Sequence, residues 1–300
     1  MGQPEVDTAS VAAFFADPAY QRALFAGILL AVACAPLGGF LILRRMSLIG
    51  DAFGHAILPG AAGAALLSGG AVWAISLGAA LTGTLVFVSA SIIGRVLRLP
   101  EDAGFALFFL TALALGVIIS AAGASHVHLD DLLFGSALKL NDTALFLCGL
   151  AVVTSIGGIA LIYRPLVIDT VDPAFLSLAG GKRSAGSVAQ AVFFGLLAVA
   201  SVASFHALGA LMAVGMMIVP AIGARYLAHK IVPMMLGAGV LGVLGVIAGL
   251  FVAFVTQWPA GACIILTLTG LAFACALIGP VNSVAERAGL WTFAARRAAV

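Results

Sequence analysis

The sequence predicts an all-α, polytopic integral membrane protein with about eight or nine transmembrane helices, some of them broken or re-entrant. Of its 300 residues, 63% are hydrophobic and only 9% are charged, whereas soluble domains carry about 25% charged residues. The apolar stretches are long and continuous, while a membrane β-barrel would show short alternating segments. The longest polar stretch, residues 164–187, is too short for a core of its own, so residues 23–280 are expected to form a single transmembrane domain.

Each expected span is an apolar run of about 20 residues that ends at charged, polar or helix-breaking residues. The runs cover residues 23–43, 48–68, 71–93, 103–122, 144–163, 188–205, 207–224, 232–256 and 262–279. Two arginines close the first run and two close the third, while Arg225 and Lys230 follow the seventh. Only His206 separates the sixth run from the seventh, so one of these two spans is expected to be broken or re-entrant.

Positive charges set the expected orientation. If the arginines that close the first run lie in the cytoplasm and the spans alternate, all of the 14 basic residues except Arg22 and Lys139 fall on the cytoplasmic side. This is the arrangement that the positive-inside rule favours. Residues 1–22 are then expected to be extracytoplasmic and residues 281–300 to form a cytoplasmic tail. The net charge of +2 indicates no nucleic-acid partner.

Asp51 and His55, in the second run, are the residues that point most directly to a function. Asp51 is the only acid inside an expected span, and a charged side chain at the bilayer centre costs about 2.5–3.5 kcal/mol on insertion scales. Four residues apart on a helix, the two side chains share one face. A carboxylate beside an imidazole is half of a transition-metal site. The pair therefore predicts half of a metal site, and an intramembrane hydrogen bond that locks the helix is the alternative.

The polar stretch between the fifth and sixth runs is expected to contain a short helix. Asp172 can cap it, Pro173 suits its first turn, and Gly180 can end it. Its apolar residues would lie in water, which indicates either docking to a soluble partner or an ordinary interfacial connector. A phosphate-binding loop is excluded because Leu176 and Arg183 stand where that motif needs glycine and serine or threonine. The chain is therefore not expected to bind ATP itself.

The remaining residues of metal-binding type are interpreted as structural. The loop before the fifth run contains two histidines and two aspartates, His126, His128, Asp130 and Asp131. They could bind a dication, but a solvated extracytoplasmic loop is the simpler interpretation. His206 and His229 are expected at helix ends. The four cysteines are expected to be buried free thiols, since no C-x-x-C pair occurs, and Met212, Met216 and Met217 to fill the core.

Four blocks of sequence occur in order along the chain. They read R-R-M-S-L-I-G-D-A-F-G-H-A-I-L-P-G at residues 44–60, L-D-D-L-L-F-G-S-A-L at 129–138, V-D-P-A-F-L-S-L-A-G at 171–180, and A-L-G-A-L-M-A-V-G-M-M-I-V-P-A-I-G-A-R at 207–225. Together they resemble the permease subunit of bacterial ABC importers for zinc, manganese or iron. The resemblance extends over nearly the whole chain, and its first block contains Asp51 and His55.

The resemblance implies an importer of several chains in the bacterial inner membrane. Two permease subunits, identical or paralogous, form the pathway, a cytoplasmic ABC ATPase dimer drives transport, and an extracytoplasmic metal-binding protein delivers the ion. Asp51 and His55 match family positions implicated in metal passage. Residues 172–181 match the coupling helix that docks on the ATPase. Its expected contact residues are Asp172, Pro173, Ala174, Phe175, Leu176, Leu178, Ala179 and Gly180. No bound cofactor is implied, and Mn²⁺ is the favoured cargo, with Zn²⁺ or Fe²⁺ as alternatives.

One Asp and one His are too few ligands to hold a dehydrated dication, so two permease copies would together supply two carboxylates and two imidazoles. Gly60, Gly63 and Ala64 would let the second spans of the two copies approach closely. Such a site must bind weakly enough to release the ion. The alternative function is a secondary transporter that uses an ion gradient through Asp51. An intramembrane metalloprotease is excluded because no H-E-x-x-H motif occurs.

Overall fold

The computed structural model describes residues 14–46, 56–69, 71–96, 101–122, 140–171, 183–228 and 230–287. Nine long helices make up most of these residues, and the described ranges contain no strand. In chain order they are α2 (Pro18–Leu43), α4 (Leu58–Ser68), α5 (Val72–Val96), α6 (Glu101–Ala122), α8 (Asp142–Val171), α10 (Arg183–Leu208), α11 (Ala210–Leu227), α12 (Ile231–Thr256) and α13 (Ala260–Arg287). The predicted all-α class is confirmed.

Six helices in the described part of the chain are long and apolar enough to cross a membrane. They are Pro18–Leu43, Trp73–Ala90, Asp142–Val171, Val188–Leu208, Ile231–Thr256 and Ala260–Gly279. Three shorter apolar helices cover Leu58–Ser68, Leu107–Ile119 and Met212–Leu227. Each of the nine expected spans therefore corresponds to one helix, as expected for a polytopic membrane protein.

The structure differs from the expected spans at two places. The second run is interrupted at Ile57, before the 11-residue helix α4, and residues 48–55 of that run lie outside the described residues. α8 continues through Pro165 to Val171, and α10 already begins at Arg183. The expected polar stretch of residues 164–187 is therefore partly helical, because hydropathy marks where apolar residues stop and not where the helix stops. Transmembrane helices also tolerate an internal proline.

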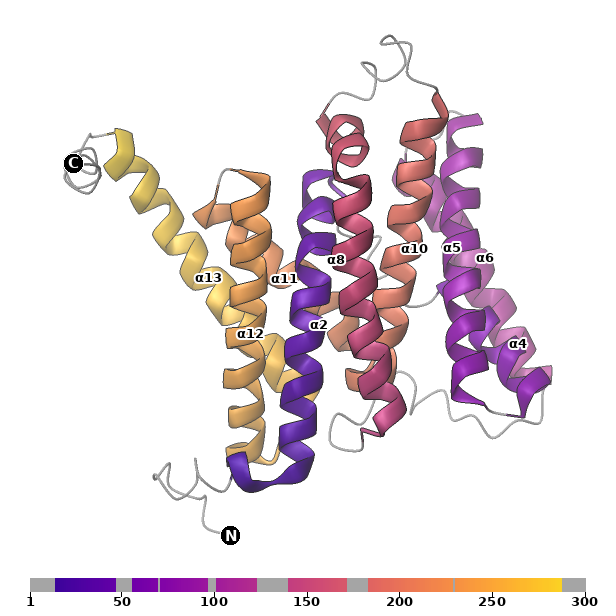
Figure 1. The fold of residues 1–300 in the computed structure, drawn as a ribbon, viewed down its shortest axis with the longest axis horizontal. Helices are drawn as coiled ribbons and strands as arrows, with labels where there is room; N and C mark the ends of the chain where they lie inside the picture. The colour runs from indigo at the N-terminus through magenta and orange to yellow at the C-terminus, as the bar shows by residue number, and fades with distance from the viewer. Residues whose placement is uncertain are drawn as a thin grey trace.

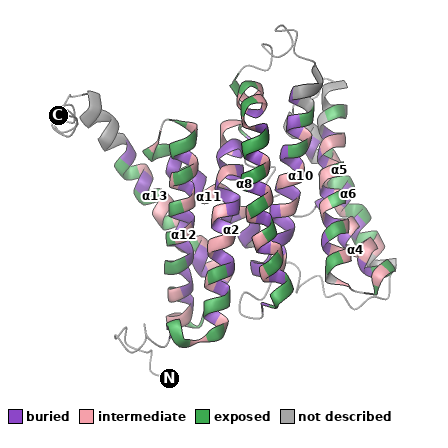
Figure 2. Ribbon diagram, viewed as in Figure 1, coloured by how far each residue is buried: buried purple, intermediate pink, exposed green. Residues whose placement is uncertain are grey.

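α2 lies near the middle of the molecule, between α12 and α8 in the view of Figure 1. It packs against α8, α10, α11 and α12. α2 and α10 are the most buried of the spanning helices, whereas the outer helices expose apolar faces (Figure 2). α12, for example, exposes Val232, Leu236, Val240 and Leu244 at every fourth position. Such a stripe suits contact with lipid, whose hydrocarbon tails are as apolar as leucine.

The boundary between the sixth and seventh spans, expected at His206, is a break at Gly209 between α10 and α11, each of which is one continuous helix. This residue has φ 89° and ψ 167°, a conformation that glycine adopts at little cost because it lacks a Cβ atom. Its N–H donates to the carbonyl oxygens of Ser204 and Phe205, both at 3.2 Å, and α10 ends there. The break therefore follows His206 by one short turn. The backbone conformation of Gly209, and not the imidazole of His206, decides its position.

α4, α5 and α6 form a three-helix group at one end of the molecule, on the right in Figure 1. The three helices pack on one another, and α5 joins the group to α10. We call this contact the α5–α10 seam. α2 and α8 end, and α10 begins, at the upper end of the molecule in Figure 1. This is the end that the charge pattern predicts to be cytoplasmic.

Candidate transport site

The residues predicted for metal passage and for docking lie outside the described residues. They are Asp51 and His55, the coupling residues Asp172, Pro173, Ala174, Phe175, Leu176, Leu178, Ala179 and Gly180, and the outer-loop residues His126, His128, Asp130 and Asp131. Their roles remain predictions. The structure does describe the helices that lead into and out of these segments, and several of these helices are fixed by specific contacts close to the segments.

α4 follows the predicted metal pair in sequence and is held by a close crossing with α5. Gly60 and Gly78 face each other there. A Cβ atom at Gly78 would lie 2.6 Å from the Gly60 carbonyl oxygen and 2.7 Å from the Cβ of Ala64. These distances leave no room for a side chain, so the crossing depends on glycine at both positions. Small residues permit this kind of approach between membrane helices.

This crossing corrects one expectation from the sequence. Gly60 and Ala64 are expected at a contact between two permease copies, but they pack on α5 of the same chain. Gly63 faces open space, with no atom within 4 Å of the position that its Cβ would take. Gly116 of α6 fixes the start of α4 from another side, because its Cβ would lie 3.0 Å from the Pro59 nitrogen. The start of α4 is therefore positioned by two helices of its own chain.

An aromatic cluster fills the α5–α10 seam on the side nearer the start of α10. The ring centroids of Phe87 in α5 and Phe194 in α10 are 5.4 Å apart. Phe105 of α6 completes the cluster, 5.2 Å from Phe87 and 5.7 Å from Phe194. All three rings are buried. Aromatic pairs at such distances contribute about 0.5–1.5 kcal/mol beyond the area they bury, so the cluster is a main attachment of the three-helix group.

His206 lies on the same seam, near the end of α10. Its Nε2 is 3.0 Å from the Oγ of Ser76 in α5, and Ser76 is buried. His206 thus joins two helices, in agreement with its interpretation as structural. Within the ranges that the structure describes, no group of three or more His, Cys, Asp or Glu side chains could hold a metal ion.

Arg44, the residue directly after α2, reaches the last turns of α8. Its Nη2 is 2.8 Å from the Asp169 carboxylate, and the two side chains are only 8% and 15% exposed. The Nε of Arg44 donates to Thr170 Oγ1 at 3.0 Å. Nη2 also donates to the Leu166 carbonyl oxygen at 3.4 Å. Because one of these bonds joins two buried opposite charges, the contact is stronger than one between neutral groups.

The same guanidinium also contacts α10. Its Cζ lies 5.7 Å from the centroid of the Phe193 ring, within the range of a cation–π interaction. We call Arg44, Leu166, Asp169, Thr170 and Phe193 the Arg44 clamp. Through it, one side chain at the end of α2 holds both α8 and α10.

A second ion pair joins α2 to α8 at their opposite ends. Arg22, in the first turns of α2, lies 3.4 Å from Asp142 at the start of α8, and it also donates to the Leu140 carbonyl oxygen at 3.3 Å. These side chains are 51% and 89% exposed. An exposed pair contributes only about 0–1 kcal/mol, so the two helices are held firmly at the clamp and loosely at the other end.

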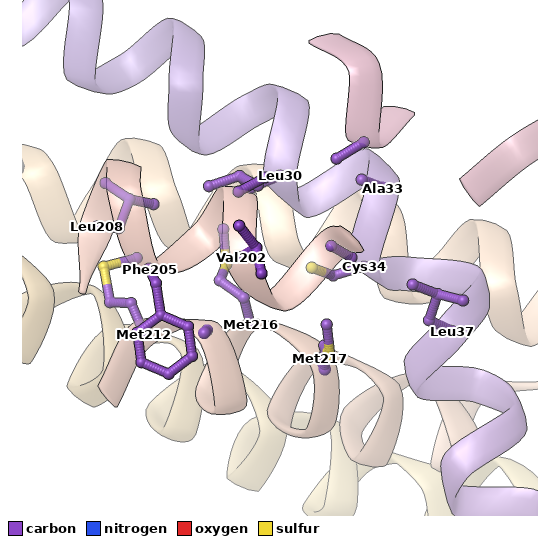
Figure 3. Close-up of a cluster of buried hydrophobic side chains, with 14 of the residues drawn as sticks. Leu30, Ala33, Cys34, Leu37, Val202, Phe205, Leu208, Met212, Met216 and Met217 are labelled. Carbon is purple, nitrogen blue, oxygen red and sulfur yellow. The ribbon is translucent and has the colours of Figure 1, made fainter. Parts of the chain in front are cut away.

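The sulfur-containing residues of α2 and α11 are core residues, as the sequence predicts. Met212, Met216 and Met217 of α11 are at most 2% exposed and pack with side chains of α2 and α10 (Figure 3). Cys34 lies in the same cluster, with its Sγ 4.0 Å from Ser204 Oγ. All four cysteines are free and buried.

The Arg44 clamp is the feature that the sequence does not predict. From the sequence, Arg44 is recognisable only as a positive charge that orients the chain in the membrane, and Asp169 only as part of a polar stretch. The available signal is that two opposite charges flank apolar runs on the same predicted side of the membrane. That signal cannot show which basic residue on that side pairs with Asp169, because the pairing depends on which helices are neighbours.

The chain is similar over most of its length to known membrane transport proteins. Residues 16–279 match the ABC 3 transport family. The chain is 32% identical over 263 residues to the manganese transport system membrane protein MntC of Halalkalibacterium halodurans, covering 84% of this chain and 86% of that protein. It is 26% identical over 252 residues to the chelated iron transport system membrane protein YfeC of Yersinia pestis, covering 84% and 83%. The fold matches PsaBC from Streptococcus pneumoniae in complex with Fab with a TM-score of 0.75, at 26% identity, over 89% of this chain and 94% of that chain.

Proposed function

This chain belongs to the ABC 3 transport family, and we propose that it is the permease of an ABC importer that moves a divalent transition metal ion into the cytoplasm. The family match over residues 16–279 carries the proposal. Mn²⁺ is the favoured cargo, because the relative at 32% identity is named for manganese transport. Fe²⁺ and Zn²⁺ are the alternatives, and a second relative is named for chelated iron transport.

The importer would contain three further kinds of chain. A second permease copy or a paralogue completes the pathway, a cytoplasmic ABC ATPase dimer supplies the energy, and an extracytoplasmic metal-binding protein delivers the ion. The sequence supports a separate ATPase because it lacks a phosphate-binding loop of its own. The permease lies in the bacterial inner membrane, with its N-terminus outside and its C-terminus in the cytoplasm, as its basic residues favour.

Asp51 and His55 are the residues proposed to bind the passing ion. Two permease copies would offer two neutral imidazoles and two carboxylates, and the negative charges of the carboxylates would balance a dication. Oxygen and nitrogen ligands of this kind suit Mn²⁺, Fe²⁺ and Zn²⁺. Binding must be incomplete or partly aqueous, since an ion that is held as in a closed structural site would not leave.

The test is metal uptake by the reconstituted importer. The permease, its ATPase and its metal-binding protein are placed in liposomes with ATP inside, and uptake of Mn²⁺, Fe²⁺ and Zn²⁺ is measured separately. Asp51→Ala and His55→Ala are compared with wild type. Asp142→Asn is the matched control, because Asp142 is an acid 89% exposed at a helix start.

We expect ATP-dependent uptake of one metal, lost in both Asp51→Ala and His55→Ala and kept in the control. Uptake by both variants at the wild-type rate would show that the pair is structural, although the family assignment would stand. Uptake that needs no ATPase and stops when an ion gradient is collapsed would favour the secondary transporter instead.

A further inference from the structure

The Arg44 clamp lies between the two segments that the proposed function depends on. Arg44 follows α2 directly, and the chain then enters the segment that contains Asp51 and His55. Asp169 lies in the last turn of α8, just before the segment predicted to dock on the ATPase. A single buried ion pair therefore ties the helix that leads to the metal pair to the helix that leads to the docking segment.

We propose that the Arg44–Asp169 ion pair transmits movement from the docking end of α8 to the end of α2, and so couples ATP hydrolysis to metal transport. This inference rests on the proposed function, since it needs an ATPase that acts on the segment after α8. Arg44 and Asp169 are positioning residues in this scheme, because they act through the segments that follow them and not on the ion.

The burial of the pair makes the connection stiff. With side chains only 8% and 15% exposed, the two charges have little access to solvent, so separating them would be costly. The planar guanidinium is also held by Thr170 Oγ1 and lies over the Phe193 ring, which restricts its orientation. The end of α8 therefore cannot move away from α2 without breaking several contacts at once.

The pair at the opposite ends of α2 and α8 has the reverse character. Arg22 and Asp142 are 3.4 Å apart and 51% and 89% exposed, so water can replace either partner at little cost. A displacement of α8 would therefore move α2 at the clamp. At the far end, the exposed pair of Arg22 and Asp142 could separate without moving α2. This difference gives the test an internal control, because both pairs join the same two helices.

The clamp also reaches the three-helix group. Phe193, beneath the guanidinium, lies beside Phe194, with ring centroids 6.0 Å apart. Phe194 in turn packs against Phe87 of α5 and Phe105 of α6. Contiguous packed side chains are a physical route for coupling between sites, although the coupling itself must be measured. A shift of Arg44 would thus reach both α4–α6 and the end of α2.

The test measures metal transported per ATP hydrolysed in the reconstituted importer. Arg44→Gln and Asp169→Asn each remove one charge of the clamp, and the double variant removes both. Arg22→Gln and Asp142→Asn are the matched controls at the other end. Arg45→Gln removes an exposed charge next to Arg44 and controls for loss of positive charge. Thermal unfolding and size-exclusion profiles in detergent identify variants that are assembled.

We expect Arg44→Gln and Asp169→Asn to lower metal transported per ATP about tenfold, within the range typical of coupling between sites, while ATP hydrolysis continues. The double variant should be no worse than either single one, since both remove the same interaction. The three control variants should stay within about twofold of wild type.

A wild-type ratio of metal to ATP in both clamp variants would overturn the proposal. This holds whether the two rates stay at the wild-type level or fall in proportion, as loss of fold stability alone would produce. If Arg44→Gln does not assemble, Asp169→Asn decides, because it keeps the size of the side chain. Failure of the wild-type importer to move any of the three metals would instead refute the proposed function.

Discussion

Ser76 of α5 and His206 of α10 share a 3.0 Å hydrogen bond that joins the three-helix group to the centre of the molecule. The aromatic cluster of Phe87, Phe105 and Phe194 occupies another part of the same seam. The seam therefore combines one polar contact with one apolar contact. The two contacts differ in how much stability they should contribute, and each can be removed separately.

Loss of the polar contact should be mild. Ser76→Ala is expected to destabilise the protein by about 0.6 kcal/mol, the average measured for interhelical hydrogen bonds in a membrane protein. Metal uptake should be unchanged, because the predicted role of His206 is a helix contact. Ser68→Ala is the control, since Ser68 donates to the Ala64 carbonyl oxygen of its own helix. Thermal unfolding in detergent and the uptake assay measure the two effects, and lost uptake in a stable Ser76→Ala protein would contradict the structural role of His206.

Loss of the aromatic contact should be severe. Phe194→Ala removes a fully buried ring that touches both α5 and α6, and a cavity of this kind costs on the order of 3 kcal/mol or more. Phe146→Ala removes the same side chain from a position on α8 that is 70% exposed, where lipid can fill the space. The unfolding temperature should therefore fall far more for Phe194→Ala. Similar falls for the two variants would show that the seam is not tightly packed.

The α4–α5 crossing should not tolerate a methyl group. Gly60→Ala would place a Cβ against the Gly78 carbonyl and the Thr82 side chain, and backbone atoms there cannot move aside as a flexible side chain could. Overpacking of this kind costs about 1–3 kcal/mol, occasionally more. Uptake should also fall, because α4 follows His55 closely in sequence.

Gly63→Ala provides the control for this crossing. Gly63 faces open space, and alanine is favoured over glycine in a helix interior by about 0.5–1 kcal/mol. This variant should therefore unfold at the same or a slightly higher temperature than wild type. A large destabilisation at Gly63, or none at Gly60, would contradict the packing described for α4.

Thiol labelling can decide the orientation in the membrane. All four native cysteines are free and buried, so the folded wild-type protein should react little with a membrane-impermeant maleimide. Asp142→Cys places a thiol at an exposed helix start that is predicted to be extracytoplasmic. Lys230→Cys places one at an exposed residue before α12, on the predicted cytoplasmic side. Asp142→Cys should label in intact spheroplasts and Lys230→Cys only after permeabilisation, and the reverse pattern would invert the topology.

The number and order of the helices can be predicted from the sequence because a bilayer demands long apolar runs. α12 is an example: residues 232–256 are expected and Ile231–Thr256 is found. The break before α11 is predicted too, since a single polar residue separates two apolar runs there. In both cases the signal is local, and it depends on composition alone.

Contacts between distant residues could not be predicted in the same way. Arg44 and Asp169 are recognisable as charges near the ends of apolar runs, but their pairing depends on α2 lying beside α8. The same limit applies to Gly60, whose small size indicates a close approach without naming the partner helix. α5 of the same chain is the partner, and a sequence read by itself gives no preference for it over a second copy. The metal pair, Asp51 and His55, lies outside the described residues and stays a prediction.

The exposed stripe on α12 and the glycine crossing of α4 with α5 have opposite consequences for how the protein can vary. Where lipid is the expected neighbour, as on the exposed stripe of α12, apolar side chains of different shapes should serve equally well. Where backbone is the neighbour, as at Gly60 and Gly78, shape is decisive and no larger residue fits. A library of random apolar substitutions should therefore leave α12 largely functional and eliminate variants of the crossing. Such a library would map which surfaces of this chain meet fluid hydrocarbon and which meet protein.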